Sequence, residues 1–354
     1  MPPPPLDLAL ELSAQARFDV VDLRSQFMLE HGDGLASYPR CLYWSAHTTA
    51  GFLDRSSLNV TLGAGRVSSY IETLRHLFPE GAGYAHDLVE RREDLDAAQR
   101  AVEPRNGDSH LAFIAGGLRP CVIHTNSPED PVYFVDLDGV SEGRARRRQT
   151  RVIGFHREAI AGRMRLRVPL SGHPIDSINL KDPKLGVYDQ LAEFVARAGV
   201  GKGRLHIALG RGERDATLTV NEFETLLMKH DLAAVLRNPL QFMAAQYQAA
   251  RANPRAVPGK ALGYARYDLV HVLNSGLDTL GLHGSFFEKV LARALTVPAS
   301  RMFRVRRSIS LLVAERADGR VGPVEGIYQS PILIQWQGAA RDVRELDVTL
   351  YALE

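Results

Sequence analysis

The sequence is poor in cysteine, and it has no apolar segment long enough to cross a membrane. Its only cysteines, Cys41 and Cys121, lie in apolar stretches, which indicates reduced core residues of a cytosolic protein. A membrane-spanning helix needs about 20 consecutive apolar residues, and no stretch approaches that length. The first residues, Met1 to Pro5, lack the basic region and the apolar core of a signal peptide. We therefore expect a cytoplasmic protein with no membrane partner.

Signatures of nucleotide binding and of dithiol chemistry are missing as well. The chain has no Walker lysine loop and no Cys-x-x-Cys pair. Gly210 and Gly212 lack the third glycine and the strand-turn-helix setting of a dinucleotide site. We expect no nucleotide cofactor.

Size and composition are those of an ordinary globular protein. With 354 residues and 39.1 kDa the chain is too long for one core of usual size, so two domains are expected. The net charge of +2 argues neither for nor against an acidic partner. Arginines gather at 144–151 and 301–307, but they alternate with strand-like residues. This pattern favours solvated strand edges over a nucleic-acid surface.

Three histidines stand in polar surroundings in the first half of the chain. An apolar stretch ending at Trp44 reads as a buried strand, and it is followed by His47, Thr48 and Thr49. Two later segments carry His86 beside Asp87, and His110 with Asp108 and Ser109 just before it. Because polar groups at strand ends and in loops can converge on one point, we predict that the three segments line one pocket.

Hydrophobic periodicity predicts strands and helices in both halves, with the boundary near Ala161. In the first half we expect a loose arm over 1–15, a helix over 67–78, and strands over 18–27, 40–46, 110–115, 120–124, 132–139 and 149–155. In the second half we expect helices over 188–198, 222–236 and 286–295, a loop over 254–263, and strands over 164–169, 204–209, 215–221, 308–315, 331–338 and 341–350. The two closing strand pairs match each other, so the sequence predicts two copies of one α+β unit, 1–160 and 161–354.

These motifs resemble the YjbQ-like family, whose members are linked to a secondary thiamine-phosphate synthase activity. The first copy has His47-Thr48-Thr49-Ala50, Tyr84-x-His86-Asp87, Ser109-His110 and a closing Val132–Gly139 hairpin strand, each in the family's order. The second copy keeps Asn221-Glu222, His230-Asp231 and Gly326-Ile327-Tyr328-Gln329. The resemblance implies two tandem domains, each a mostly antiparallel sheet or sandwich with helices packed on it.

The two copies depart from the family pattern in complementary ways. The first copy has Arg55-Ser56 near the expected Asn-Glu, and the second has Glu213-Arg214-Asp215 where the His-Thr-Thr segment would begin. Because single-copy members of the family are expected to be trimers with sites near subunit contacts, complementary loss implies one composite site. We predict that the three histidines face Asn221, Glu222 and His230, in a pseudo-symmetric monomer or a homo-oligomer.

The chemistry of such a site follows from its side chains. His47, His86 and His110 are compatible with an open tri-histidine site for a divalent metal such as Zn or Mg, with Asp87 or Asp108 as an orienting carboxylate. Thr48 and Thr49 can donate to a phosphate. We predict catalytic roles for the three histidines, Asp87 and Glu222, and substrate contacts from Thr48, Thr49, Asp108, Asn221 and His230.

The resemblance implies a transferase that joins an aminopyrimidine methyl diphosphate to a thiazole phosphate and releases pyrophosphate. Two alternatives stay open at this stage. One is a metal-dependent hydrolase of a phosphorylated small molecule, which would use a metal-bound water. The other is a non-catalytic binding or scaffold protein, because duplicated chains often lose activity.

Overall fold

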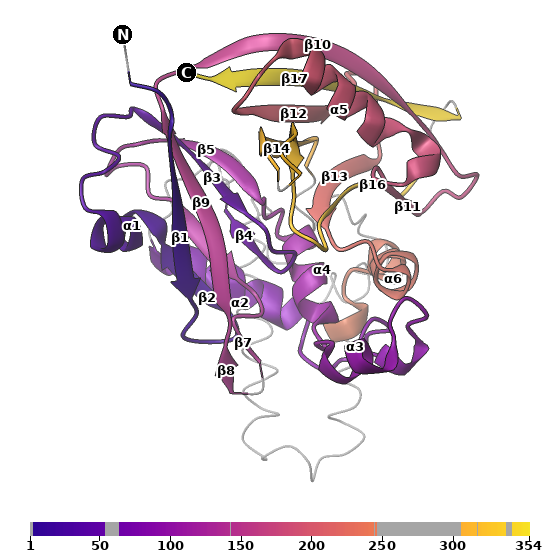
Figure 1. Ribbon diagram of the computed structural model, residues 1–354. Helices are drawn as coiled ribbons and strands as arrows, with labels where there is room; N and C mark the ends of the chain where they lie inside the picture. The colour runs from indigo at the N-terminus through magenta and orange to yellow at the C-terminus, as the bar shows by residue number, and fades with distance from the viewer. Residues whose placement is uncertain are drawn as a thin grey trace, which may run out of the picture. The chain divides into compact units, whose positions relative to one another are not determined.

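The structure is a computed structural model of the whole chain, and it describes residues 3–53, 64–141, 143–243, 245, 306–316, 318–337 and 342–354. The protein is α+β, with antiparallel sheets and helices (Figure 1). Residues 1–160 hold β1 (Leu6–Ser13), β2 (Asp19–Asp22), α1 (Leu23–His31), β3 (Arg40–Ser45), β4 (Ala50–Phe52), α2 (Ala64–Leu77), η2 (Val89–Arg91), α3 (Ala97–Val102), α4 (Gly107–Ala115), β5 (Cys121–Thr125), β6 (Tyr133–Asp136), β7 (Val140–Ser141), β8 (Arg144–Ala145) and β9 (Arg147–Phe155).

The rest of the chain continues with a long strand that begins just before residue 160. Its elements are β10 (Glu158–Pro169), β11 (Asp176–Asn179), η3 (Pro183–Leu185), α5 (Val187–Ala198), β12 (Gly203–Leu209), β13 (Ala216–Asn221), the π-helical η4 (Leu226–Asp231), α6 (Leu232–Arg237), β14 (Ser308–Glu315), β15 (Val321–Val324), β16 (Ser330–Gln335) and β17 (Val343–Leu353). A boundary at residue 160 falls inside β10, so the division into two copies stays a prediction.

The strand order of the first half recurs in the second. One sheet has the order β1-β9-β3-β5, and its counterpart has the order β10-β17-β12-β14 with β15 added at the edge. A smaller sheet has the order β2-β6-β4, and its counterpart has the order β11-β16-β13. Neighbouring strands pair antiparallel in all four sheets. Position by position, β3 therefore corresponds to β12, β4 to β13, β6 to β16 and β9 to β17.

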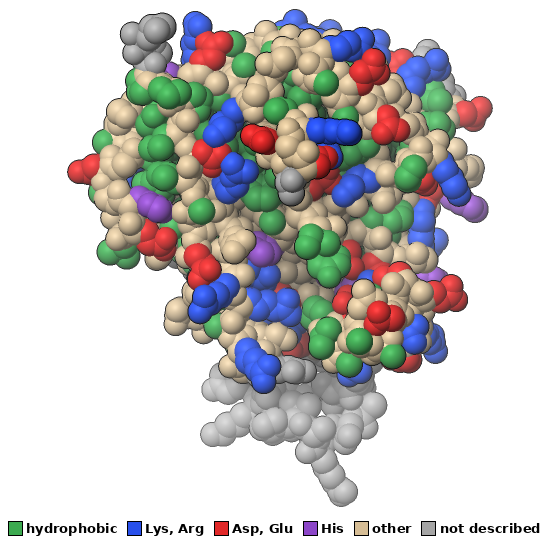
Figure 2. All heavy atoms as spheres, viewed as in Figure 1, with side chains coloured by type: hydrophobic (Ala, Val, Ile, Leu, Met, Phe, Trp, Pro, Cys, Tyr) green, Lys and Arg blue, Asp and Glu red, His purple; other side chains and the backbone are tan. Residues whose placement is uncertain are grey.

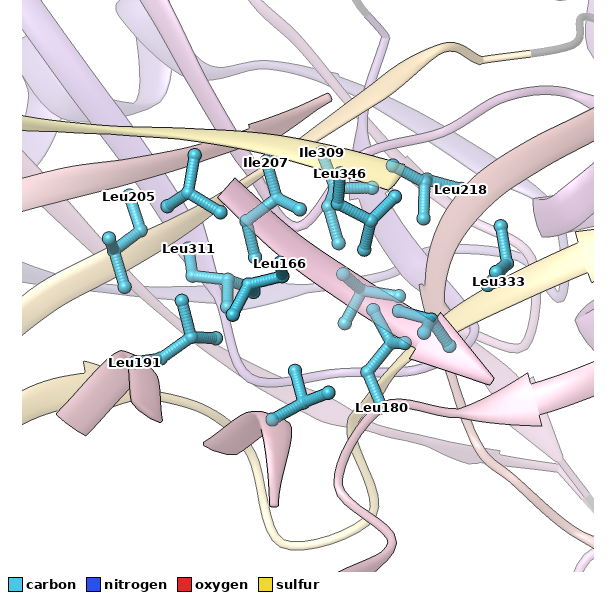
Figure 3. Close-up of a cluster of buried hydrophobic side chains, with 14 of the residues drawn as sticks. Leu166, Leu180, Leu191, Leu205, Ile207, Leu218, Ile309, Leu311, Leu333 and Leu346 are labelled. Atoms are coloured by element: carbon cyan, nitrogen blue, oxygen red, sulfur yellow. The ribbon is translucent and has the colours of Figure 1, made fainter. Parts of the chain in front are cut away.

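Apolar residues hold these sheets together. Helix α5 is amphipathic, and its apolar face consists of Val187, Leu191 and Val195. This face packs against the sheet that contains β10. This core also includes Leu166, Leu205 and other aliphatic side chains (Figure 3). A second core lies under α1 around Phe27 and Phe52, with residues of β1, β3 and β9. A third joins strands of both halves, with Leu42, Trp44, Cys121, Ile153, Phe155, Leu312, Ala314 and Leu353.

Several expected elements are confirmed and others are wrong. The helices over 67–78 and 188–198 and most of the strands are present, and both cysteines are free and buried. Residues expected as a loose arm form β1, which pairs with β9. Residues 18–27 are not one strand, because Asp22 caps helix α1 by accepting from the Arg24 amide.

Two further corrections concern elements that carry site residues. Residues 110–115 belong to helix α4 rather than to a strand. The five residues after His110 are all apolar, so their spacing does not distinguish a helix from a strand. The helix expected from Glu222 begins only at Thr225. The helix expected over 286–295 and the loop over 254–263 lie outside the described residues.

The chain divides into two compact units, and each takes segments from both halves. The first unit comprises Met1–Asp54, Gly117–Phe223 and Val305–Glu354, and the second comprises Arg55–Gly116 and Glu224–Arg304. On the face shown in Figure 2, acidic and basic side chains are interspersed. No helix in the described ranges has the length and apolarity that a membrane crossing requires.

Candidate functional site

The predicted histidine loop joins β3 to β4 in the first unit. Residues 46–49 connect the end of β3, Ser45, to the start of β4, Ala50. The Ser45 hydroxyl donates to the Ala50 carbonyl at 3.2 Å and accepts from the His47 amide at 3.3 Å. The Thr49 carbonyl accepts from the Leu137 amide at 3.0 Å. Contacts within the first half therefore fix the loop at both ends, and side chains of the second half add to them.

Two amide side chains from the second half of the sequence hold this loop from outside. Asn221, at the end of β13, donates from Nδ2 to the Thr48 carbonyl at 2.8 Å. Gln329 donates from Nε2 to the carbonyls of Ser45 and His47 at 3.0 and 2.8 Å. Both side chains are buried, so the loop carbonyls satisfy amide donors that would otherwise be buried without a partner. Asn221 thus contacts the His47 loop through a backbone carbonyl, and its predicted contact with substrate stays a prediction.

Gly326 explains why the second half can approach so closely. A Cβ built at this position would lie 1.8 Å from the Ala46 carbonyl oxygen, so only glycine fits without moving the backbone. The Gly326 amide donates to Oε1 of Gln329 at 2.9 Å, which orients the amide that reaches the loop.

His47 itself is a neutral imidazole at pH 7. Burial, and after it the positive charges of Arg148 and Arg146, lower the pKa of His47 to about 4, against a hydrogen bond with the Gln149 backbone. Nε2 is buried and has no hydrogen-bond partner among the described residues.

Arg148 is the central residue of a buried polar group. The sequence predicted that Arg148, like the other arginines of 144–151, lies on a solvated strand edge. Its Nε and Nη2 donate to the two carboxylate oxygens of Asp136 at 2.7 and 2.8 Å, and Nη2 also donates to the Asp138 carbonyl at 2.7 Å. Arg146 lies 3.1 Å from the Asp138 carboxylate, with 31% of its side chain exposed. Arg147 is indeed exposed, so the strand-edge interpretation is right for Arg147 and wrong for Arg148.

His86 sits in a separate buried cluster in the second unit. Nδ1 lies 3.1 Å from Oε2 of Glu224, and Nε2 lies 3.3 Å from Oδ1 of Asn106. The amides of Ala85 and His86 donate to the Asp231 carboxylate at 2.8 and 2.9 Å. Both ring nitrogens of His86 are therefore occupied.

The acids of this cluster are held in different electrostatic states. Burial raises the pKa of Glu224, but hydrogen bonds from His86 and from two backbone amides outweigh burial and hold that pKa below its usual value. Burial raises the pKa of Asp231, and the amides of His86 and Ala85 oppose the rise only in part. Glu224 is thus a committed anion, which suits a charge-assisted hydrogen bond to His86.

The remaining predicted residues divide between the units. His110 lies in α4 and packs edge-on against His86, with ring centroids 5.0 Å apart. Asp87 caps the same helix by accepting from the Gly107 amide at 2.9 Å, and Asp108 is buried in its first turn. His230 is exposed. Glu222 and the residues of the His47 loop belong to the first unit, and a pocket shared by all three histidines stays a prediction.

His47 belongs to the first unit and His86 and His110 to the second, so a metal site formed by all three stays a prediction. Within the described ranges, no three His, Cys, Asp or Glu side chains are placed to hold a metal ion. His86 has its two nitrogens committed to Glu224 and Asn106. No step proposed below runs through a metal.

Five residues central to these sites were missing from the predicted set. They are Asp136, Arg148, Glu224, Asp231 and Gln329. Asp231 and Gln329 stand in motifs that already carried the family resemblance, so their roles could have been found there. Glu224 and Arg148 carry no motif, because their partners are 138 and 12 residues away in sequence.

Comparison with known proteins gives structural matches only. No family model and no curated protein matches the sequence. A YbjQ-like protein of unknown function from Sulfolobus solfataricus is 15% identical, with 55% of this chain and 99% of that chain covered, at a TM-score of 0.28. A hypothetical protein from Aeropyrum pernix is 15% identical, with 55% and 99% covered, at a TM-score of 0.29.

A third match is an uncharacterised conserved protein of the yjbq/upf0047 family from Clostridium acetobutylicum. It is 14% identical, with 53% of this chain and 98% of that chain covered, at a TM-score of 0.24. Each of the three matches thus spans about half of this chain. At such TM-scores the similarity carries no information about activity.

Proposed function

We propose that the chain is a tandem duplicate of a YjbQ-like domain and that the His47 loop binds a phosphorylated small molecule. The repeated strand order of the two halves supports the duplication. The complementary motifs support a single composite site, because Asn221 and Gln329 of the second half hold the loop that carries His47 in the first. That inter-half support of the loop is the observation on which the proposal depends.

The reaction that we propose is a thiamine-phosphate synthase-type transfer, in which a thiazole phosphate displaces pyrophosphate from an aminopyrimidine methyl diphosphate. The thiazole nitrogen forms the new C–N bond as the C–O bond to pyrophosphate breaks, and the electron pair leaves with pyrophosphate. Negative charge then builds on the leaving oxygens, and donors aimed at them lower the barrier.

The residues near His47 offer such donors. Because His47 is neutral at pH 7, the positive charge comes from Arg146 and Arg148 rather than from an imidazolium. The hydroxyl of Thr48, which is partly exposed, adds a neutral donor. The committed ring of His86 gives no comparable opening, so we place the reaction at His47.

A condensation assay tests the proposal. The purified chain is given both substrates, and thiamine phosphate and pyrophosphate are measured against time. We expect turnover in the wild type, a loss of at least about tenfold in kcat/KM for His47→Ala, and wild-type rates for His173→Ala, which removes an exposed histidine of the same unit.

Other products would replace the proposal with one of its alternatives. Release of phosphate or pyrophosphate from the pyrimidine substrate alone identifies a hydrolase. Absence of every product from a chain that binds phosphate identifies a binding protein.

A further inference from the structure

The two halves place one arginine in the same position and differ in what it binds. Arg148 is the second residue of β9, and Arg344 is the second residue of β17, the strand that corresponds to β9. Both are buried, with 5% and 1% of their surface exposed. A pair of buried guanidiniums at matching positions of matching sheets can be compared donor by donor.

Two of the three nitrogens make the same contacts in both halves. Nε of Arg148 donates to Asp136, the last residue of β6, and Nε of Arg344 donates to Gln335, the last residue of β16. Nη2 of Arg148 donates to the Asp138 carbonyl, and Nη2 of Arg344 donates to the Gln337 carbonyl, two residues beyond the strand in each half.

The third nitrogen is where the halves part. Nη1 of Arg344 donates to the Glu213 carboxylate and to the Arg214 carbonyl, both at 2.8 Å. Nη1 of Arg148 has no hydrogen-bond partner among the described residues. Nη1 is not among the buried side-chain atoms that lack a partner, so this N–H pair reaches solvent at the edge of an otherwise buried guanidinium, where an anion could bind it.

The residue that fills the position in the second half corresponds to His47. Glu213 stands three residues before β13, and His47 stands three residues before β4. The second half thus supplies its own carboxylate where the first half places a neutral ring. Arg148 donates to Asp136, and Asp136 pairs with Ala50 at the end of the His47 loop, so the guanidinium and the loop meet at the same strand pair.

We propose that Nη1 of Arg148, beside His47, receives an oxyanion of the ligand, and that the Glu213 carboxylate occupies the equivalent place in the second half. The ligand class is a carboxylate or a phosphoryl group, because both present the oxygen geometry that a guanidinium binds. This inference names the anchor of the site under Proposed function and rests on it only for the identity of the substrate. Asp136 already balances the charge of Arg148, so we expect weak, roughly millimolar, affinity for inorganic phosphate alone.

Exchange of the two loop residues tests the inference. His47→Glu gives the first half the carboxylate of the second, and we expect it to pair with Arg148, to abolish phosphate binding and to leave the melting temperature unchanged or higher. His173→Glu, which places the same carboxylate at an exposed histidine of the same unit, is the matched control and should bind phosphate within about threefold of wild type. Calorimetric titration with phosphate and, separately, with acetate gives the affinities. Tighter binding of phosphate or of acetate tells which of the two classes the ligand belongs to.

The reverse change opens the second half. In Glu213→Ala the buried Arg344 loses its anion, so the variant should melt lower and phosphate should raise its melting temperature more than it raises that of the wild type. If Glu213→Ala does not fold, Glu213→Gln keeps the volume and removes the charge, and we expect the same phosphate-dependent gain.

Two results would overturn the inference. The first is an affinity of His47→Glu for phosphate equal to that of the wild type. The second is a Glu213 variant whose melting temperature rises with phosphate no more than that of the wild type. These binding measurements need no turnover. A chain that binds phosphate in the expected way but condenses nothing refutes the proposed reaction and leaves the anchor in place.

Discussion

His47 and His86 stand in similar local sequence, each beside a hydroxyl or carboxyl residue, yet the structure holds them in opposite ways. Both ring nitrogens of His86 lie within hydrogen-bond distance of side chains, those of Glu224 and Asn106. The pKa of Glu224 is lowered, so its carboxylate is ionised. His47 has a buried nitrogen with no partner among the described residues, and it lies near two arginines. A histidine whose contacts are complete serves stability, whereas one with an open nitrogen beside an open guanidinium can serve a ligand.

The largest effect should come from breaking the complete cluster. His86→Ala leaves the Glu224 carboxylate buried without its ring partner, so we expect a loss of about 3–5 kcal/mol in the free energy of unfolding. Denaturant titration followed by circular dichroism measures it. His230→Ala, which removes an exposed histidine of the same unit, should change the stability by less than about 0.5 kcal/mol. Equal stabilities of the two variants would mean that the cluster contributes nothing.

A methyl group at Gly326 should come next, and it should affect the open site as well as stability. Because the added Cβ would lie 1.8 Å from the Ala46 carbonyl, Gly326→Ala must move the loop, at a cost of about 1–3 kcal/mol. We also expect phosphate affinity to fall, which calorimetry would show. Gly172→Ala is the control, since its Cβ would meet nothing within 4 Å. Unchanged affinity in Gly326→Ala would separate the loop from the site.

Loss of the Gln329 amide should have a smaller effect of the same kind. Gln329→Ala leaves the carbonyls of Ser45 and His47 without their buried donor, which should cost about 1–2 kcal/mol and weaken phosphate binding severalfold. Gln190→Ala, an exposed glutamine whose amide bonds Gly186 within the same unit, should leave both quantities near wild type. If Gln329→Ala bound phosphate normally, support from the second half would be irrelevant to the site.

The smallest expected effect is the contribution of His47 to the pH dependence of the free energy of unfolding. The pKa of His47 is lowered from 6.5 to about 4, so the folded state resists protonation and stability falls as the pH drops below the unfolded value of 6.5. Between about pH 7.5 and about pH 6 we expect His47 to remove about 1 kcal/mol. Comparing the pH dependence of unfolding in wild type and His47→Gln isolates that amount. Identical curves would contradict a depressed pKa.

The sequence predicted the elements more reliably than the contacts. Strands and helices with a clear period, such as those over 149–155 and 188–198, are confirmed, because burial on one side leaves a readable alternation. Helix α4 was mistaken for a strand because all of its residues are buried, and its apolar run 111–115 is too short and too uniform to show a period. The two closing strand pairs that the sequence matched occupy equivalent places in the strand orders, while the duplication itself stays a proposal.

The candidate site was predicted only in part, for a reason that lies in sequence separation. The His47 loop and Asn221 were both identified, and their contact spans 173 positions. Arg148 was missed because its neighbours in sequence are exposed, so nothing local distinguishes a buried guanidinium from a solvated one. Only the comparison of β9 with β17 reveals it, and that comparison needs both halves at once.

The apolar core that joins strands of both halves, with Leu42 and Phe155 from one and Leu312 and Leu353 from the other, has a consequence for how such a chain can diverge. Separating the two halves would expose that apolar layer to water, so neither half is expected to fold without the other. If the two halves always occur together, a functional residue needs to be kept at only one of two corresponding positions. The corresponding residue of the other half can then take a structural role. Glu213, whose carboxylate binds Arg344, would be such a residue under the proposed duplication.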